Sequence, residues 1–209
     1  MIEVPKSSLG SPTNLLVTTP ESEYGYLPIP KNASGYAYDF FSQFDWKYYQ
    51  YDNYDEVKNK KKIVLFREPF ERWCSGVAQD VFFQKLKLDP EGPDALFKLF
   101  LEPRIGIHTY PQSHYLSHID PSTLIFIRVD NNLIKNMEAL VKNVMKTKLL
   151  QHFPTPYKST TYYRIKNKVS EALKANPIFQ QKLKMYLAED IRIYKSTKFY
   201  TGQKKVDYL

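Results

Sequence analysis

The strongest constraint on the fold is a run of four apolar residues, 63–66 (IVLF), that ends at Arg67 and is followed two residues later by Pro69. An uninterrupted apolar run of this length is typical of a strand buried on both faces. Proline suits the first turn of a helix, where its missing N–H costs no hydrogen bond. Apolar residues then recur at helical spacing, so the pattern predicts a strand, a tight loop and an amphipathic helix.

The same pattern occurs earlier in the chain. Residues 24–29 form a short aromatic and aliphatic run that stops at Pro30, and residues 34–44 then carry phenylalanine and tyrosine at helical spacing. Further strands are expected at 46–51 and 124–127, and further helices at 95–101, 131–146 and 177–194. This alternation predicts an α/β domain with a three-layer architecture, a parallel sheet covered by helices on both faces. Ligands of such sheets bind beyond the carboxyl ends of the strands.

The chain length of 209 residues fits one such domain. Residues 1–23, rich in Ser, Thr and Pro, are expected to form an irregular arm, and residues 24–209 the domain. No apolar run approaches the roughly 20 residues that span a bilayer, and residues 1–20 do not resemble a signal peptide. The single cysteine, Cys74, fits a reducing compartment. A cytoplasmic protein without a membrane anchor is therefore expected.

The net charge of +8 predicts an anionic partner. Charge alone does not distinguish nucleic acid, an acidic polysaccharide and a phosphorylated nucleotide. The lysine cluster at residues 58–62 is most simply a solvated turn, and the aromatic residues near it fit no RNA-binding pattern. Nucleic acid is therefore not the expected partner, although a basic nucleic-acid-binding domain remains an alternative.

The loop between the strand expected at 24–29 and the helix expected at 34–44 has the composition of a phosphate-binding loop, or cradle. Small residues let backbone N–H groups curl around an anion, the helix N-terminus adds partial positive charge, and Lys31 adds a full one. The other expected contacts follow Lys31 directly: Asn32, Ala33, Ser34, Gly35 and Tyr36. The Gly-Lys-Ser/Thr signature of nucleoside triphosphatases is absent. A helix opened by Ser34 beside a solvent-exposed lysine is the simpler alternative.

A second anion site is expected where residues 63–66 meet the following helix. Arg67 at the strand end and Ser75 about two turns into the helix can both reach one phosphate, the arginine through paired donors and the serine through its hydroxyl. Arg72 is expected to pair with a neighbouring carboxylate. The alternative for Arg67 is a structural ion pair.

Together the two segments resemble the nucleotide-binding signatures of sulfotransferases that use 3′-phosphoadenosine 5′-phosphosulfate (PAPS). The pattern Pro-Lys-x-Ala-Ser, known from carbohydrate sulfotransferases, is matched by Pro30, Lys31, Ala33 and Ser34. The 3′-phosphate motif Arg-x-Pro-x-x-Arg-x-x-Ser is matched by Arg67, Pro69, Arg72 and Ser75. The resemblance implies a sulfotransferase fold akin to that of P-loop nucleoside triphosphatases, PAPS as donor substrate and no metal. It also implies transfer to a hydroxyl or amine acceptor, most simply a carbohydrate.

Weaker similarities extend along the chain. Residues 127–133 resemble the strand and helix start that carry an acidic pair, with Asp130 where the family has glutamate. Lys158 and Ser159 resemble the late loop that folds over the nucleotide. Gly35 stands where the family has Ser or Thr, which removes one hydroxyl from the cradle.

The resemblance places Lys31 at the bridging oxygen of the donor, where negative charge develops. It gives two candidates for the general base. His108, in a stretch similar to His-x-x-Pro-Gln, ranks first. Asp52, just past the strand expected at 46–51, ranks second. His114 and His118 stand four apart but lack a third ligand at a recognisable spacing, so no metal is expected.

Two other readings share these features. A kinase of the phosphate-loop class would have the same sheet and anion site but lacks its signature here. A sulfotransferase-like protein that binds the donor without turnover is the other, because no base is certain from the residues alone.

Overall fold

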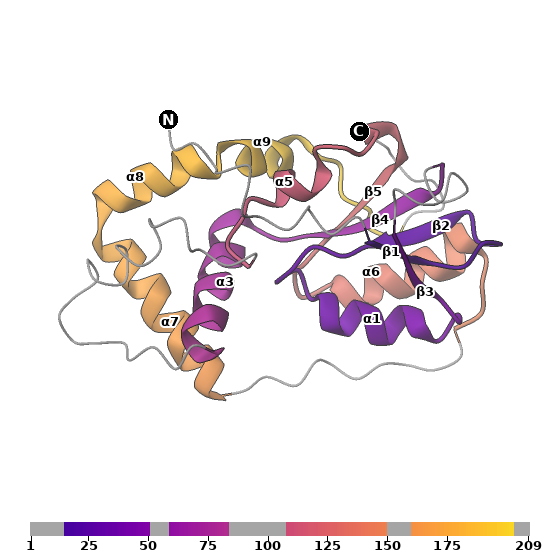
Figure 1. The fold of residues 1–209 in the computed structure, drawn as a ribbon, viewed down its shortest axis with the longest axis horizontal. Helices are drawn as coiled ribbons and strands as arrows, with labels where there is room; N and C mark the ends of the chain where they lie inside the picture. The colour runs from indigo at the N-terminus through magenta and orange to yellow at the C-terminus, as the bar shows by residue number, and fades with distance from the viewer. Residues whose placement is uncertain (1–14, 51–58, 84–107, 150–159, 203–209) are drawn as a thin grey trace.

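The computed structural model describes residues 15–50, 59–83, 108–149 and 160–202. They form an α/β architecture in which a five-stranded sheet has helices on both faces (Figure 1). The helix expected at 95–101 lies outside the described residues, as do Asp52, Lys158 and Ser159. Within the described ranges, no helix is long and apolar enough to cross a membrane.

The sheet is mixed, with the strand order β3-β1-β2-β4-β5. Its strands are β1 (Leu15–Thr18), β2 (Tyr24–Leu27), β3 (Lys47–Gln50), β4 (Lys61–Phe66) and β5 (Leu124–Arg128). The expectation of a parallel sheet holds for β2, β4 and β5, while β1 runs antiparallel to both β2 and β3.

The strand β1 lies within residues 1–23, for which an irregular arm was expected. Its sequence, Leu-Leu-Val-Thr, is short but has the β-branched and apolar character of a strand. Five residues separate it from β2, too few for the crossover that a parallel neighbour requires, so the two strands pair as an antiparallel hairpin. The departure from a parallel sheet thus follows from loop length.

The three parallel strands end at one edge of the sheet. Leu27 of β2 pairs with Val64 of β4, and Phe66 of β4 pairs with Arg128 of β5. The apolar run of β4 is fully buried, as its sequence predicted. The loops that leave these three strands therefore emerge side by side, where sequence motifs far apart in the chain can meet.

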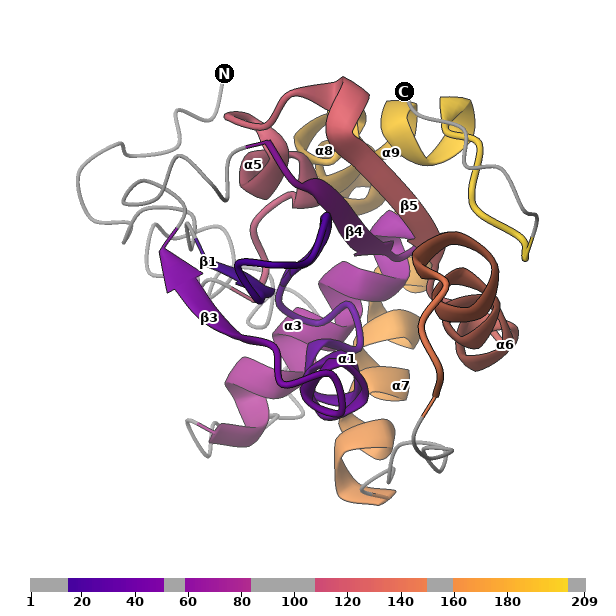
Figure 2. The ribbon, with the colours of Figure 1, turned by 90° about the vertical axis from the view of Figure 1, so that its right-hand side faces the viewer.

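Two helices cover one face of the sheet (Figures 1 and 2). They are α1 (Ser34–Ser42) and α6 (Leu133–Leu140), which continues into a π-helical turn, Val141–Met145. The aromatic residues expected to face the core do so: Tyr36, Phe40 and Phe41 are buried against β2 and β4, and Phe41 stacks on Trp46 at 4.8 Å between ring centroids.

The opposite face carries α5 (Gln112–Leu116) and α9 (Ala188–Ser196). Their buried side chains meet Val64, Phe66 and Phe126 of the sheet in a second apolar cluster. The single helix expected at 177–194 is therefore two helices. The chain turns at Leu187, between α8 (Pro177–Tyr186) and α9. The helix α8 packs in a third apolar cluster, described below, whereas α9 packs on the sheet.

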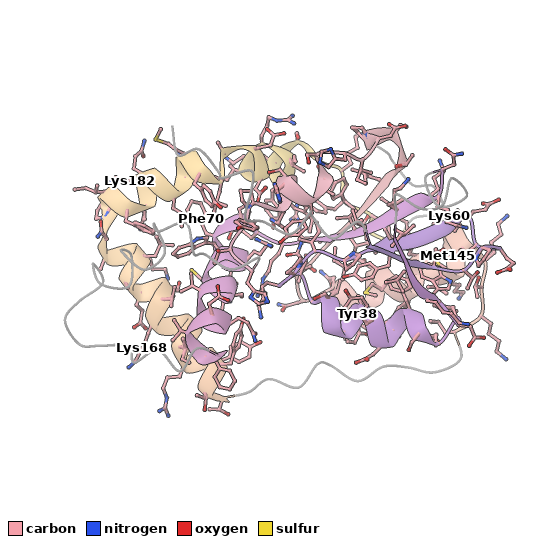
Figure 3. The ribbon with its side chains drawn as sticks, in the orientation of Figure 1. Tyr38, Lys60, Phe70, Met145, Lys168 and Lys182 are labelled. Carbon is pink, nitrogen blue, oxygen red and sulfur yellow. The ribbon has the colours of Figure 1, made fainter. Side chains whose placement is uncertain are left out.

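The third cluster joins α3 (Pro69–Phe83), α7 (Thr160–Ala175) and α8 (Pro177–Tyr186) beyond the end of the sheet. Phe70 packs against it at the start of α3, while Lys168 and Lys182 point outward from α7 and α8 (Figure 3). The helix α7 was not expected. Only Val169 and Leu173 of its sixteen residues are buried, so the helix is mostly polar, although these two residues stand four apart, as on one helix face.

Candidate active site

A cavity of about 970 Å³ lies at the carboxyl edge of β2, β4 and β5. Its walls come from the loops after these strands, from α3 and from α7. Most residues expected to bind a ligand line it: Lys31, Ala33, Ser34, Gly35, Tyr36, Arg67 and His108. Three segments that are far apart in the sequence thus share one cavity. Asp130 of the weaker similarity also borders it.

The loop after β2 has the backbone of an anion cradle. Lys31 and Ala33 have φ angles of 68° and 57°, a left-handed conformation that costs a non-glycine residue on the order of 1 kcal/mol. The chain then enters α1 at Ser34 with no side-chain cap. The first N–H groups of a helix have no intrahelical acceptor, and a tight turn before them gathers such donors around an anion. The strained turn therefore supports the expected phosphate cradle.

The side chain of Lys31 is held across the cavity by α3 and α7. Its Nζ donates a hydrogen bond of 2.7 Å to Oε1 of Gln79 and lies 4.8 Å from the centre of the Tyr162 ring. Burial, with a smaller contribution from the Arg67 guanidinium, lowers the pKa of the Lys31 ammonium to about 8, while Asp80 opposes the shift. A cation this poorly solvated gains more than an exposed lysine from an incoming anion.

Arg67 lies at the end of β4 beside a second cation. Its Nη2 is 3.4 Å from Oε2 of Glu71, and Nζ of Lys166 on α7 is 2.5 Å from the same oxygen. Burial alone would raise the pKa of the Glu71 carboxyl, but Lys166 and Arg67 together outweigh it and lower that pKa. Glu71 is half exposed, so a phosphate can replace its carboxylate between Arg67 and Lys166.

Ser75 is not on the cavity wall. Only 1% of the residue is exposed, and its Oγ has no hydrogen-bond partner among the described residues. The hydroxyl of Tyr162 donates to the backbone oxygen of Ser75 at 3.0 Å. Tyr162 lines the cavity and Ser75 does not, so the structure as it stands gives the Ser75 hydroxyl no contact with a ligand there.

Asn32 is the other expected contact that faces away from the cavity. Its fully buried amide donates to the backbone oxygen of Leu65 at 2.6 Å and to Oε1 of Gln112 at 2.7 Å. The same Gln112 oxygen accepts from the backbone N–H of Arg67, and the Gln112 amide donates to the Arg67 carbonyl. Asn32 and Gln112 therefore fix the two anion-binding loops relative to each other.

Arg72 is a structural residue, although not through the carboxylate pair that was expected. It is 1% exposed, its Nε donates to the carbonyl of Pro30 at 3.0 Å, and its Nη1 donates to the carbonyl of Tyr110. The buried carboxylate nearby, Asp190, instead accepts from the backbone N–H groups of Gln112 and Ser113. Helix α3 thus ties the cradle to the segment that precedes α5.

His108 enters the cavity from the segment before α5. Its Nδ1 lies 2.8 Å from Oδ1 of Asp80 on α3. The backbone of His108 also packs closely against α3 at Gly76. A Cβ added at Gly76 would lie only 2.2 Å from the His108 carbonyl oxygen, so no larger residue fits there. Helix α3 therefore fixes both the main chain and the ring of His108.

Sequence reasoning gave no role to four polar residues that hold the predicted ones in place: Gln79, Asp80, Gln112 and Lys166. Of these, Gln112 was noted only as the last residue of the His-x-x-Pro-Gln stretch. One signal was available in α3. Arg72, Gly76 and Asp80 follow at intervals of four, so they share one side of the helix, next to the apolar side formed by Trp73, Val77 and Val81. Lys166 carries no such signal, because only the tertiary packing of α7 on α3 brings it to Glu71.

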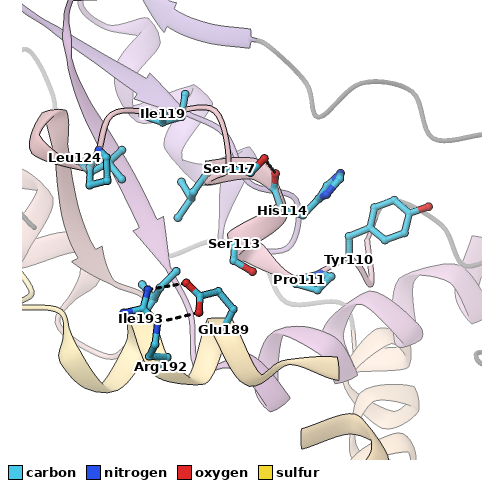
Figure 4. Close-up of a pocket in the computed structure, with 12 residues that line it drawn as sticks. Tyr110, Pro111, Ser113, His114, Ser117, Ile119, Leu124, Glu189, Arg192 and Ile193 are labelled. Atoms are coloured by element: carbon cyan, nitrogen blue, oxygen red, sulfur yellow. Dashed lines mark hydrogen bonds and ion pairs between the residues drawn. The ribbon is translucent and has the colours of Figure 1, made fainter. Parts of the chain in front are cut away.

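A second cavity, of about 400 Å³, lies between α5, α9 and the start of β5 (Figure 4). Leu124, the first residue of β5, lines it, so it is not at the carboxyl edge of the parallel strands. Its Glu189 and Arg192 hydrogen-bond to each other at 2.6 and 2.8 Å. It brings together none of the residues expected to bind a nucleotide.

No protein-family profile, curated protein or solved structure matches this chain.

Proposed function

We propose that the chain is a sulfotransferase of the P-loop-like sulfotransferase fold, which transfers a sulfuryl group from PAPS to a carbohydrate hydroxyl or amine. The observation that carries the proposal is the meeting of Lys31, Arg67 and His108 in one cavity at the carboxyl edge of the parallel strands. Each comes from a different segment of the sequence resemblance. A strained anion cradle at the start of α1 supports the same assignment.

In this proposal the two phosphate ends of the donor occupy different parts of the cavity. The 5′-phosphosulfate lies against Lys31 and the first backbone N–H groups of α1. The 3′-phosphate lies between Arg67 and Lys166, where Glu71 now bridges the two cations. A contact from Ser75 remains a prediction, because the residue is buried and does not line the cavity.

The reaction is an in-line displacement at sulfur. The acceptor oxygen or nitrogen attacks, a new bond to sulfur forms, and the bond between sulfur and the bridging oxygen breaks. That oxygen leaves with the electron pair on the 5′-phosphate of 3′-phosphoadenosine 5′-phosphate (PAP), and Lys31 neutralises its charge. The acceptor proton passes to His108. The chemistry takes no metal ion as cofactor, so turnover in a chelator distinguishes it from phosphoryl transfer by a magnesium-dependent kinase.

Replacement of Arg67 tests the 3′-phosphate assignment. Arg67→Ala is expected to weaken PAP binding by about tenfold or more while leaving 5′-AMP binding within about twofold, because only PAP has the phosphate that the guanidinium contacts. Isothermal titration calorimetry of both nucleotides measures this. Arg192→Ala is the matched control, because this exposed arginine lines the second cavity and not the proposed nucleotide site. Equal losses for PAP and 5′-AMP would contradict the assignment.

Gly35 offers a test in which affinity should increase. A Cβ at this position meets nothing within 4 Å, so serine fits without a clash and returns the hydroxyl that the family has there. Gly35→Ser is expected to tighten PAP binding roughly two- to tenfold, the value of one added hydrogen bond. Gly35→Ala controls for the gain in helix propensity. If both variants bind PAP equally, this part of α1 does not face the phosphate.

A further inference from the structure

The carboxylate of Asp80 lies directly behind the ring of His108. Its Oδ1 is 2.8 Å from His108 Nδ1, and the residue is 8% exposed and does not line the cavity that His108 lines. We infer that Asp80 is a positioning residue, which holds His108 as the Nδ1–H tautomer and so leaves the lone pair of Nε2 to the cavity. The catalytic consequence rests on the proposed function, whereas the tautomer does not.

The tautomer follows from the hydrogen-bonding groups. An ionised carboxylate only accepts hydrogen bonds, so the contact with Asp80 requires the proton on Nδ1 of His108. A neutral imidazole carries one N–H, which leaves Nε2 as an acceptor able to take a proton. When Nε2 is protonated, the adjacent carboxylate stabilises the cation without receiving the proton, as in the Ser-His-Asp arrangement of hydrolases.

The rest of α3 supports a positioning role. Close contact at Gly76 fixes the backbone of His108 one turn before Asp80. Gln79, the residue next to Asp80, holds Nζ of Lys31 at 2.7 Å. Consecutive residues of one helix therefore orient both the expected base and the group that meets the leaving oxygen. A base held this way loses less entropy on reaching the reactive geometry than one on a free side chain.

The alternative is an ion pair that serves only stability. Such an ion pair would have the same distance between Asp80 and His108. In that case, however, a change in the tautomer of His108 would leave turnover unchanged. A substitution of Asp80 that keeps its shape separates the two, because asparagine can donate to Nδ1 of His108 and stabilise the Nε2–H tautomer instead.

The first test is nitrogen NMR of the full chain labelled with ¹⁵N-histidine, with His108→Ala assigning the signal among the four histidines. The wild type is expected to show Nδ1–H at neutral pH, and Asp80→Asn to gain the Nε2–H form. An Nε2–H tautomer in the wild type overturns the inference without any variant. Asp39→Asn, an exposed aspartate on α1, is the control.

The second test links the tautomer to the reaction without requiring a known acceptor. Release of labelled sulfate from labelled PAPS to water is expected to fall by about 10²-fold in Asp80→Asn, with PAP affinity within about twofold of the wild type. Unchanged release, or a matching loss of PAP affinity, overturns the positioning role. A wild type that binds no PAP contradicts the proposed function instead, and leaves the tautomer result to stand alone.

Discussion

Replacing Lys31 with alanine is expected to lower kcat by about 10²-fold or more at saturating donor. The ammonium is held by Gln79 beside the cradle. In the proposed reaction it meets charge that develops on the bridging oxygen only as the bond to sulfur breaks. An interaction that strengthens in the transition state appears in kcat, whereas one equally strong in the ground state appears in the affinity for the donor. Single-turnover rates of sulfate release from labelled PAPS separate the two.

Lys182→Ala is the matched control, because Lys182 is an exposed lysine on α8 (Figure 3). Unchanged kcat with weaker PAP binding would make Lys31 a binding residue only. A pH titration adds a second readout. With a pKa of about 8 in the free protein, Lys31 loses its charge as pH rises through that value, so PAP affinity should decline above about pH 8. The decline in PAP affinity that comes from Lys31 should be absent in Lys31→Ala.

Replacing His108 with alanine is expected to lower kcat by about 10²-fold or more, the usual contribution of a general base. The ring lines the cavity and is fixed by Asp80, so its removal should leave PAP affinity nearly unchanged. Turnover of labelled PAPS at saturating donor measures the effect. His118→Ala is the control, since His118 is exposed and outside the cavity.

Asp52→Ala decides between the two candidate bases. Asp52 lies outside the described residues, so its variant is the only direct test of its role. An active His108→Ala beside an inactive Asp52→Ala would place the base between the two phosphate motifs. If both variants stayed fully active, proton removal would not limit the rate or would belong to another residue.

The strand and helix units around the site could be predicted because their signals are local. The apolar run at 63–66 marks the end of β4, and the proline that follows marks the start of α3. The small residues after β2 mark the turn into α1. The strand β1 and the break at Leu187 could not be predicted this way. The strand β1 is only four residues long, too short for a clear pattern, and the break at Leu187 depends on two helices that pack in different clusters.

The residues of the site also fall into those that local sequence motifs indicate and those that depend on tertiary packing. Lys31, Arg67 and His108 could be identified from motifs, and the structure brings all three to one cavity. Motifs do not show which side of a loop or helix a residue faces, and here Asn32 in its loop and Ser75 on α3 are both buried. Nor do they show partners from other elements, such as Asp80 behind His108 or Lys166 beside Glu71. Those contacts exist only once α3 and α7 are packed.

The most direct test of the proposed function is calorimetric titration of the wild-type protein with PAP and, in parallel, with 5′-AMP. The two nucleotides differ only in the 3′-phosphate, which the proposal places between Arg67 and Lys166. Charge-assisted hydrogen bonds to that group predict that PAP binds at least about tenfold more tightly than 5′-AMP. Equal affinities, or no binding of PAP, would contradict the assignment of this cavity to a sulfotransferase donor.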